Sequence, residues 1–343
     1  MAERVRIAVA GAGYWGINHV RAFSRLAGCE LVAVCDPDER ARGRAAQLAP
    51  HARIERALEP LLADPDVDAV VLATPAVAHA AQAQAALAAG KHVFVEKPLA
   101  LTAADARATV AAATAHGSTL MVGHLMLYHP AFQRLAELVA QGELGRVFYL
   151  HALRVNLGRL RSDENALWSF APHDLSMILS LVSSPPVSVA ARGEAYLQAG
   201  VEDVVFVNIA FADRTMAQIQ LSWLDPRKER RLTVVGSKKM VELDDAHPTE
   251  KLRVYDKGYD RPPEFTQYGE YLTVRQGDIH IPRVDMAEPL ERECLHFIES
   301  IRNGTPPRSD GPSALKVVEL LEAASRSLRE GGRPIELPAA LIR

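Results

Sequence analysis

The feature that most constrains this chain is a regular alternation of wholly apolar runs and helical stretches near its N-terminus. The runs, such as Val5–Ala10, residues 31–35 and the segment "VDAVVLAT", are short and do not alternate polar with apolar residues. Strands of that kind are buried on both faces, and strands separated by helices form a parallel sheet. The sequence therefore predicts an α/β domain, a doubly wound parallel sheet of the Rossmann type, over residues 1–122.

Beyond residue 122 the pattern changes. Runs such as "RVFYLHALRV" and "DVVFVNIAF" are joined by short turn-like segments, which predicts an antiparallel or mixed sheet, and long helices return at residues 289–302 and 312–329. We therefore expect a second, α+β domain over residues 123–343. Residues 247–283 are rich in Pro, Gly, Tyr and charge and are expected to form a surface loop, with an oligomer arm or a lid as alternatives.

Composition and charge narrow the class of protein. A chain of 343 residues has room for two domains, and 48% hydrophobic with 24% charged residues is typical of a globular protein. The net charge of -3 provides no broad basic surface, so neither nucleic acid nor a membrane is expected as a partner. Three cysteines in apolar surroundings, and an N-terminus without a signal-peptide pattern, predict a soluble cytoplasmic protein.

The segment "VAGAGYWG" places Gly11, Gly13 and Gly16 in G-x-G-x-x-G spacing, after a predicted strand and at the start of a predicted helix. In that context the first glycine permits a tight turn, the second lets a pyrophosphate approach the backbone, and the third lets helix and strand pack closely. Asp36 ends the second predicted strand, where a carboxylate can bind ribose hydroxyls, although it can also simply begin a turn. The pattern predicts a dinucleotide site and favours NAD over NADP, with Arg40 leaving NADP open.

The segment "KHVFVEKPLA" ends a predicted buried strand in Glu96, Lys97 and Pro98. In a doubly wound sheet the ligand crevice lies at the carboxyl ends of the strands. A lysine there can donate a proton to a substrate oxygen or accept one, with its pKa lowered by burial and by a positively charged cofactor. A solvated pair of Glu96 and Lys97 at a strand end is the alternative that these residues alone leave open.

The glycine segment, together with "ATPAVAHAAQAQAALAAGKHVFVEKPLA", resembles the Gfo/Idh/MocA family of oxidoreductases, and "VVGSKKMVEL" and "ECLHFIESIRNGTPPRSDG" extend the resemblance over nearly the whole chain. The resemblance implies a C-terminal domain with a large, mostly antiparallel open sheet, on which a homodimer or homotetramer is built. It also implies that Lys97 is the catalytic lysine. The residues that it implies at the cofactor are Tyr14, Trp15, Thr74, Pro75, His79, Glu96 and Lys97 itself.

The second catalytic element of that family is a histidine near the start of a helix, usually with an aspartate four residues before it. In "LWSFAPHDLSMILSLV" the histidine position is His173, and Ser169 stands where the aspartate usually is. Pro172 suits the first turn of a helix, which would put His173 and Asp174 beside the free amides of the helix N-terminus. We therefore expect His173 to be a second catalytic base, with a capping or core histidine as the alternative.

Further substrate contacts are expected from residues near the predicted crevice. They are Tyr128, or His124 in its place, Asn156, Arg159 and Trp168, in addition to Lys97 and His173. An arginine there suits a phosphate or carboxylate group, and an ordinary surface arginine is an equal alternative. His79, His124 and His129 match no standard zinc pattern, so no metal is expected.

The resemblance and these residues predict an NAD-dependent dehydrogenase acting on CH–OH groups, in which Lys97, assisted by His173, removes the hydroxyl proton of a secondary ring alcohol. The "SFAPHD" element and the arginine-bearing loop look most like the branch that oxidises UDP-linked sugars at C3. Inositol, free-sugar and glycoside dehydrogenases are alternatives, because the fold does not settle the substrate. A dinucleotide-binding regulator without catalysis is a second alternative, which the serine at position 169 would fit.

Overall fold

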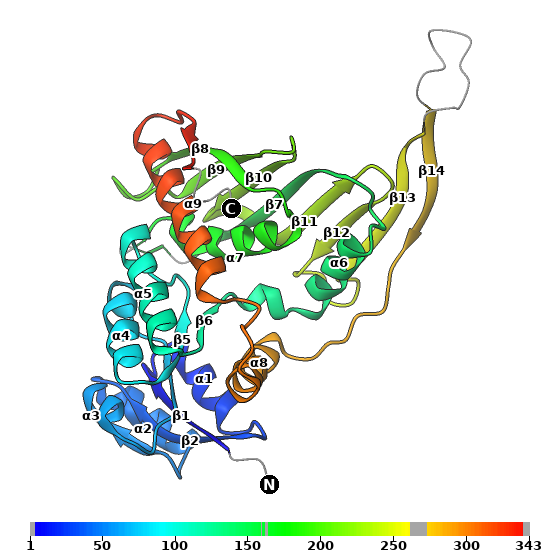
Figure 1. Ribbon diagram of the computed structural model, residues 1–343. Coiled ribbons are helices and arrows are strands. Elements are labelled where there is room, and N and C mark those ends of the chain that lie inside the picture. The colour runs from blue at the N-terminus through cyan, green and yellow to red at the C-terminus, as the bar shows by residue number, and fades with distance from the viewer. Residues whose placement is uncertain (1–3, 159, 162–163, 261–272, 339–343) are drawn as a thin grey trace. The chain divides into compact units, whose positions relative to one another are not determined.

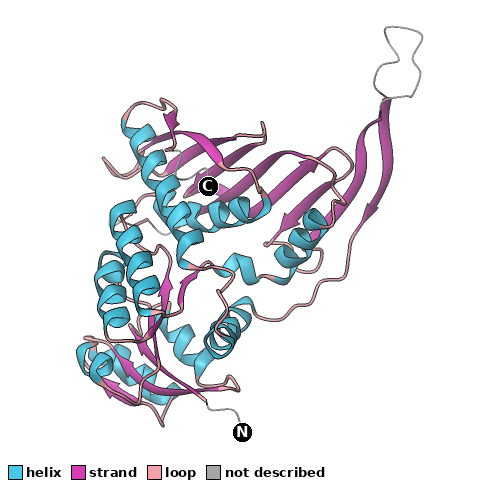
Figure 2. Cartoon of the chain, in the orientation of Figure 1, coloured by secondary structure: helices cyan, strands magenta, loops and turns pink. Residues whose placement is uncertain are grey.

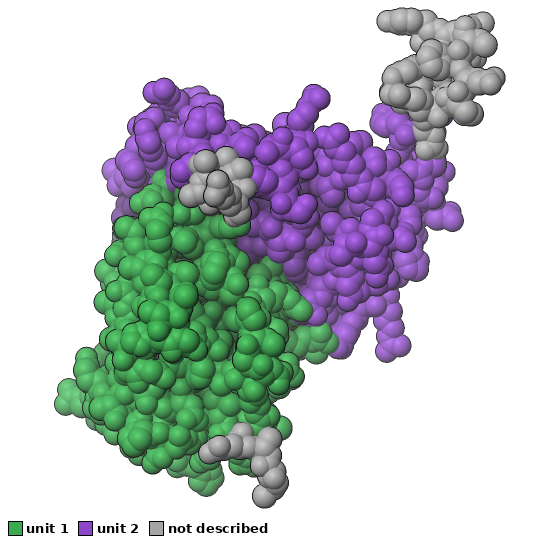
Figure 3. Space-filling model, in the orientation of Figure 1, with its two compact units in different colours: residues 1–128, 287–322 green, residues 129–286, 323–343 purple. Residues whose placement is uncertain are grey.

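The computed structural model describes residues 4–158, 160–161, 164–260 and 273–338. The chain forms two units, shown in green and purple in Figure 3. Unit 1 contains Met1–Tyr128 and Ala287–Glu322, and unit 2 contains His129–Met286 and Ala323–Arg343. The first crossing of the chain between the units, after Tyr128, lies close to the boundary expected at residue 122. The return of the chain to unit 1 at Ala287 was not predicted.

Unit 1 is built on a six-stranded sheet in the order β3-β2-β1-β4-β5-β6, and all of its paired strands are parallel (Figure 1). The strands are β1 (Val5–Ala10), β2 (Cys29–Cys35), β3 (Arg53–Glu55), β4 (Ala69–Leu72), β5 (His92–Glu96) and β6 (Leu120–Gly123). All four residues of β4 and all four of β6 are buried, as expected for strands covered on both faces. The predicted doubly wound α/β domain is confirmed.

Helices cover both faces of this sheet (Figure 2). They are α1 (Gly16–Phe23), α2 (Glu39–Leu48), α3 (Glu59–Ala63), α4 (Ala76–Ala88), α5 (Ala103–His116), the short 3₁₀ helix η1 (Leu125–Tyr128), α8 (Pro289–Asn303) and the first part of α9 (Gly311–Arg329). The ends of α5 show why the sequence folds in this way. The hydroxyl oxygen of Thr102 accepts a hydrogen bond from the amide of Asp105 at the N-terminus, and Gly117 ends the helix in the left-handed conformation.

The helix α8 belongs to unit 1 although more than 150 residues of unit 2 precede it in the chain. Its apolar side packs beside α1 and against β1. The ring of Phe297 lies 5.6 Å from the ring of Phe94 on β5, in an edge-to-face arrangement, and both side chains are fully buried. Truncating a buried phenylalanine costs about 3–5 kcal/mol, so this contact is a substantial part of the core of unit 1.

Unit 2 is built on a nine-stranded sheet in the order β14-β13-β12-β11-β7-β10-β9-β8-β15. The strands are β7 (Val147–Leu157), β8 (Pro186–Glu194), β9 (Val204–Phe211), β10 (Met216–Ser222), β11 (Leu224–Gly236), β12 (Met240–Asp244), β13 (Leu252–Asp260), β14 (Thr273–His280) and β15 (Ile335–Glu336). Its pairings are antiparallel except for β7 with β10, which are parallel. The expected mostly antiparallel sheet is confirmed.

One face of the nine-stranded sheet is covered by helices of the same unit. α6 (Pro130–Ala140) packs against β12, and α7 (Ala166–Leu181) packs over β7, β9 and β10. Along β9 buried and more exposed residues alternate, which is the period of a strand with one covered face. Phe206 and Met216, which are 41% and 61% exposed as residues, stand at exposed positions of β9 and β10.

The segment 247–283 is not simply a surface loop. It contributes β13 and β14, which pair with each other at one edge of the sheet, and nearly every residue of β14 is exposed. The polar and aromatic composition that suggested a loop is also that of a ribbon with little core of its own. In the part of the chain that the structure describes, no helix is long and apolar enough to cross a bilayer.

Candidate functional site

The glycine loop of unit 1 has the geometry that a dinucleotide site requires. Gly11 has a φ of +90°, and a Cβ there would lie 2.5 Å from the carbonyl oxygen of Ala73. A Cβ on Gly16 would lie 2.0 Å from the carbonyl oxygen of Gly11, whereas a Cβ on Gly13 would meet no atom within 4 Å. The first and third glycines are therefore required by the chain itself. The second borders open space, as the approach of a pyrophosphate to the backbone requires, so the loop fits NAD.

Asp36 stands at the end of β2, where the sequence predicted it. Its side chain is buried, one carboxylate oxygen accepts a hydrogen bond from the amide of Ala12 at 2.7 Å, and the other accepts one from the amide of Asp38 at 2.8 Å. Asp36 therefore holds the glycine loop in place. Each carboxylate oxygen has a second lone pair, so contact with ribose hydroxyls stays compatible with this role. The exposed Arg40 lies in the first turn of α2.

Glu96 and Lys97 follow one another at the carboxyl end of β5. The carboxylate of Glu96 accepts hydrogen bonds from the indole nitrogen of Trp15 and from Nε2 of His19, each at 2.6 Å, and from the amide of Lys97 at 3.2 Å. Burial raises the pKa of Glu96, but the hydrogen bond and charge of His19, followed by Trp15 and Lys97, outweigh it, so the pKa is lowered. Lys97 is half-buried, and the peptide bond between Lys97 and Pro98 is cis.

Thr74, Pro75 and His79 lie at the start of α4 and connect it by hydrogen bonds to the segment that follows β5. Pro75 precedes the first residue of α4, and the hydroxyl of Thr74 donates to the side chain of Gln82 at 2.6 Å. The ring nitrogens of His79 lie 2.8 Å from the carbonyl oxygen of Thr74 and 2.7 Å from that of Pro98. His79 is 1% exposed, so it connects the start of α4 to the segment after Lys97. A direct contact of His79 with a cofactor stays a prediction.

Two buried titratable residues near Glu96 were not singled out as a pair by the sequence. His124 follows β6, is 1% exposed, and has a pKa lowered to about 4, chiefly by burial. Glu293 on α8 is fully buried, and burial, followed by the charge of Glu96, raises its pKa well above the usual value. Among the described residues, neither side chain has a hydrogen-bond partner. The apolar period of α8 predicts a buried face, but it gives no sign that Glu293 lies near Glu96.

Tyr128 is placed in the core of unit 1. Its side chain is 1% exposed, its hydroxyl lies 2.9 Å from the hydroxyl of Ser309, and the guanidinium of Arg308 lies 5.4 Å from its ring centre. Burial raises the pKa of the phenol. These contacts give Tyr128 a structural role, and it is a weaker candidate for substrate contact than the sequence suggested.

In unit 2, the expectation that Pro172 lies in the first turn of a helix is wrong. The helix α7 begins at Ala166, with Asn165 as its cap, and Pro172 lies inside it. The expected position of His173 and Asp174 beside free helix amides is therefore also wrong. His173 is half-buried in the middle of the helix, and Ser169, one turn before it, is buried.

Asp174 has a different role from the one expected. Its two carboxylate oxygens accept hydrogen bonds from Nε and Nη2 of Arg154 on β7, at 2.7 and 2.9 Å, and both side chains are buried. Burial alone would lower the pKa of Arg154, but the charge and hydrogen bonds of Asp174, with Asp245 behind them, raise it. The pair attaches the segment of α7 that carries His173 to the sheet.

The other predicted substrate contacts of unit 2 are placed as follows. The indole nitrogen of Trp168 donates to the hydroxyl of Ser325 at 2.9 Å. Asn156, near the end of β7, has a buried amide oxygen that bonds no described residue. Arg159 lies outside the described residues. The structure thus keeps Trp168 and Asn156 as candidates, the first with its indole already bonded.

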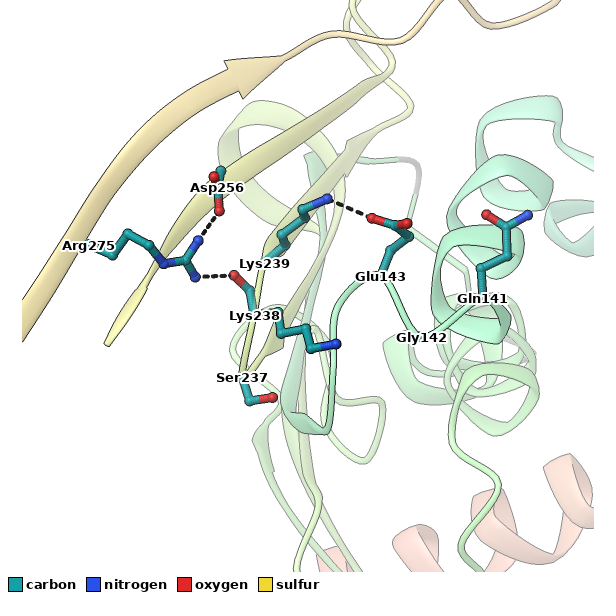
Figure 4. Close-up of a pocket in the computed structure, with 8 residues that line it drawn as sticks. All are labelled: Gln141, Gly142, Glu143, Ser237, Lys238, Lys239, Asp256 and Arg275. Carbon is teal, nitrogen blue, oxygen red and sulfur yellow. Dashed lines mark hydrogen bonds and ion pairs between the residues drawn. The ribbon is translucent and has the colours of Figure 1, made fainter. Parts of the chain in front are cut away.

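A separate pocket in unit 2 has a volume of about 510 Å³ and is shown in Figure 4. It is lined by Gln141, Gly142, Glu143, Ser237, Lys238, Lys239, Asp256 and Arg275. Its charges largely pair with one another, since Lys239 lies 2.6 Å from Glu143 and Arg275 bonds Asp256. None of the residues predicted from the sequence lines it.

Comparison with known proteins agrees with this geometry. Residues 5–124 match the family described as "Oxidoreductase family, NAD-binding Rossmann fold", and residues 132–242 match the "GFO/IDH/MocA C-terminal domain". D-apiose dehydrogenase of Paraburkholderia graminis is 28% identical, covering 98% of this chain and 90% of its own length. UDP-N-acetylglucosamine 3-dehydrogenase of Acidithiobacillus ferrooxidans is 28% identical over 92% of this chain and 94% of its own.

Among solved structures, GenD2 from gentamicin A biosynthesis, in complex with NAD, superposes with a TM-score of 0.82. It is 28% identical and covers 99% of this chain and 98% of its own. The matches cover residues of both units, and the glycine loop and the end of β5 lie within the residues 5–124 that match the NAD-binding model. The chain belongs to the Gfo/Idh/MocA family of NAD(P)-dependent oxidoreductases acting on CH–OH groups.

Proposed function

We propose that this protein transfers a hydride between NAD and a secondary ring alcohol or ketone of a sugar-type substrate. The observation that carries the proposal is the arrangement of Lys97 at the carboxyl end of β5, held by Glu96 beside the glycine loop. A primary amine at that position can accept the proton of a hydroxyl group or return it. The residues of the loop supply the backbone groups that bind the cofactor phosphates.

The division of chemistry is as follows. NAD, when bound, accepts the hydride from the carbinol carbon. Lys97 takes the hydroxyl proton, so that the alcohol becomes a ketone, and in the reverse direction it returns that proton. His173 is proposed as the second catalytic residue. Because Ser169 replaces an acidic residue one turn earlier, the imidazole has no carboxylate at that position, and we assign the main proton transfer to Lys97.

The substrate that we propose first is a UDP-linked sugar oxidised at C3. This proposal is supported by the similarity of the chain to a UDP-N-acetylglucosamine 3-dehydrogenase. A free sugar is the second candidate, supported by the D-apiose dehydrogenase. An inositol or a glycoside remains a further alternative within the same chemistry. A dinucleotide-binding regulator without catalysis is the alternative from a different class, and the serine at position 169 is the observation that favours it.

We further propose that NAD is preferred over NADP, because Asp36 presents a carboxylate at the end of β2. The open face of the nine-stranded sheet, with exposed apolar residues such as Phe206 and Met216, supports a homodimer or homotetramer. A cytoplasmic location is part of the proposal. It is supported by Cys29, Cys35 and Cys294, which are buried free thiols.

The test begins with calorimetric titration of the purified protein with NAD and NADP, followed by an absorbance screen for reduced cofactor with UDP-sugars, free sugars and inositols. Lys97→Met should abolish turnover and leave NAD binding in place. Lys228→Met, at an exposed lysine on β11, is the matched control and should leave both unchanged. NAD binding without turnover on any ring alcohol, or full turnover in Lys97→Met, would reject the enzyme that we propose.

A further inference from the structure

Glu96, whose side chain is 12% exposed, and the fully buried Glu293 interact electrostatically in unit 1, and the structure gives the two carboxyl groups opposite surroundings. Glu96 accepts three hydrogen bonds, from Trp15, His19 and the amide of Lys97. Glu293 is fully buried, and among the described residues neither of its oxygens has a hydrogen bond. Of two carboxyl groups that repel each other, the one with hydrogen-bond donors keeps its charge more readily, and burial favours the neutral form of the other.

We propose that Glu96 is a positioning residue, whose charged carboxylate aligns Lys97 with the glycine loop and sets its affinity for a proton, and that Glu293 stays a neutral carboxylic acid behind it. The proposal rests on the function proposed above, since the alignment serves proton transfer by Lys97. It assigns Glu96 a task other than contact with the cofactor. It also assigns a protonation state to a residue that the mechanism does not use.

The hydrogen bonds of Glu96 connect segments that are far apart in the sequence. Trp15 lies in the loop between Gly11 and Gly16, and His19 lies on α1. The third donor is the backbone of Lys97 itself. A single carboxylate therefore joins the loop that fits the cofactor phosphates to the residue that handles the proton, so a displacement of one is transmitted to the other.

The neighbouring strand is shaped around this carboxylate. Glu96 pairs with Gly123 in the register of β5 with β6. A Cβ on Gly123 would lie 2.9 Å from Oε2 of Glu96 and 3.0 Å from its Cδ. The glycine thus leaves the space that the carboxylate occupies. Because the φ of Gly123 is not positive, alanine is compatible with the backbone there and would act by displacing the side chain of Glu96.

The other titratable groups around Glu96 come from three elements. His19 lies on α1, His124 follows β6, and Glu293 and Cys294 lie on α8, with Sγ of Cys294 3.8 Å from Nδ1 of His19. Burial keeps the pKa of His124 near 4 and raises that of Cys294 well above its usual value. At neutral pH, therefore, His124 and Cys294 add no charge near Glu96 and Lys97.

The charge of Lys97 lowers the pKa of Glu96, so by linkage the charge of Glu96 raises the pKa of Lys97. Glu96→Gln should therefore lower the pKa of Lys97, by roughly half a unit for two charges about 6 Å apart at the dielectric constant of water and by more at a lower one. Glu293→Gln removes no charge and should leave the pKa of Lys97 unchanged. Gly123→Ala keeps the charge but moves it, and should lower the pKa of Lys97 by less than Glu96→Gln does.

The experiment measures the rate at which Lys97 reacts with acetic anhydride between pH 6 and 11 in the ligand-free protein, by mass spectrometry of the peptide that contains it. The exposed Lys228 in the same digests provides the internal reference, and its rate of labelling at each pH should be the same in all variants. Circular dichroism melting shows which variants are folded. If Glu96→Gln does not fold, Gly123→Ala carries the test, since it retains every hydrogen-bonding group.

A shift in Glu96→Gln without a shift in Glu293→Gln would support the assignment. An unchanged pKa of Lys97 in Glu96→Gln, or an equal shift in both glutamine variants, would overturn it. Because the labelling requires neither substrate nor cofactor, a wild-type protein without turnover would refute the proposed function and leave this result standing. Where turnover is found, the ascending limb of the pH profile of kcat/KM should move to lower pH in Glu96→Gln by the shift seen in labelling.

Discussion

The ion pair between Arg154 and Asp174 gives the strongest prediction about stability. Asp174→Leu would leave a buried guanidinium without its partner, because the two side chains are only 8% and 2% exposed. Breaking a buried pair by removing one partner costs about 3–5 kcal/mol. For a unit of this size, each kcal/mol lowers the melting temperature by roughly 2–4 °C, so the expected loss is about 6–20 °C.

The assay is thermal unfolding followed by tryptophan fluorescence. Two of the three tryptophans of the chain, Trp168 and Trp223, lie in unit 2, so the fluorescence change mainly reports on the unit that contains the pair. Arg154→Met and the double variant complete a double-mutant cycle. The double variant should be more stable than Asp174→Leu, because an apolar pair of similar volume leaves no unpaired charge. A melting temperature of Asp174→Leu within about 2 °C of the wild type, or a double variant less stable than both single variants, would refute the reasoning.

Three further predictions concern unit 1. The pKa of His124 is about 4 in the folded state and about 6.5 in the unfolded state, so protonation of His124 favours unfolding as the pH falls below 6.5. At pH 4 this lowers the free energy of unfolding by up to roughly 3 kcal/mol. His124→Gln should therefore reduce the loss of melting temperature between pH 7 and pH 4.5. Gly16→Ala should prevent folding, because the added Cβ would lie 2.0 Å from a backbone oxygen. Gly13→Ala, whose Cβ meets no atom, should have the melting temperature of the wild type but bind NAD at least tenfold more weakly in calorimetric titration. Asp36→Asn should lower the affinity of the protein for NAD and reduce the ratio of its NAD affinity to its NADP affinity in the same titration. An unchanged ratio of the two affinities would contradict the role of the Asp36 charge.

The first unit was largely predictable from the sequence because its signals are local. Apolar runs without alternation identify the buried strands, and the end of a parallel strand is a fixed place in the fold, so Glu96 and Lys97 could be assigned to the ligand edge from their position alone. The strand β3 and the helix α3 were not predicted, because each is short and has too few apolar residues to show a period.

The start of α7 was misjudged for a physical reason. Proline is common in the first turn of a helix and costs about 3 kcal/mol in its interior, so Pro172 was assigned to a first turn. The structure tolerates it inside the helix because Ala171, Pro172 and Leu175 are buried, and the packing of that face outweighs the local preference. The cap at Asn165 was the signal that could have corrected the assignment.

The environment of Glu96 could not be inferred from the sequence. His19, Gly123 and Glu293 all lie around Glu96, but they are between 27 and almost 200 positions away from it in the sequence. The apolar period of a helix predicts which of its faces is buried, but not which sheet that face will cover. Trp15 was expected at the cofactor, but its bond to Glu96 depends on how the loop meets β5. Local patterns therefore placed Lys97 at the end of β5 and missed the residues around Glu96.

The placement of α8 in unit 1 has a consequence for the order in which the chain is made. A ribosome completes β1 to β6 first, but the face that Phe297 covers stays open until the chain has been extended past unit 2. At about 5–20 residues per second, that delay is on the order of 10–40 s. During that interval Phe94 is within reach of chaperones or of other nascent chains. An mRNA truncated anywhere before the codons of α8 would therefore yield a protein in which both units are incomplete, since unit 2 also includes the residues after Glu322.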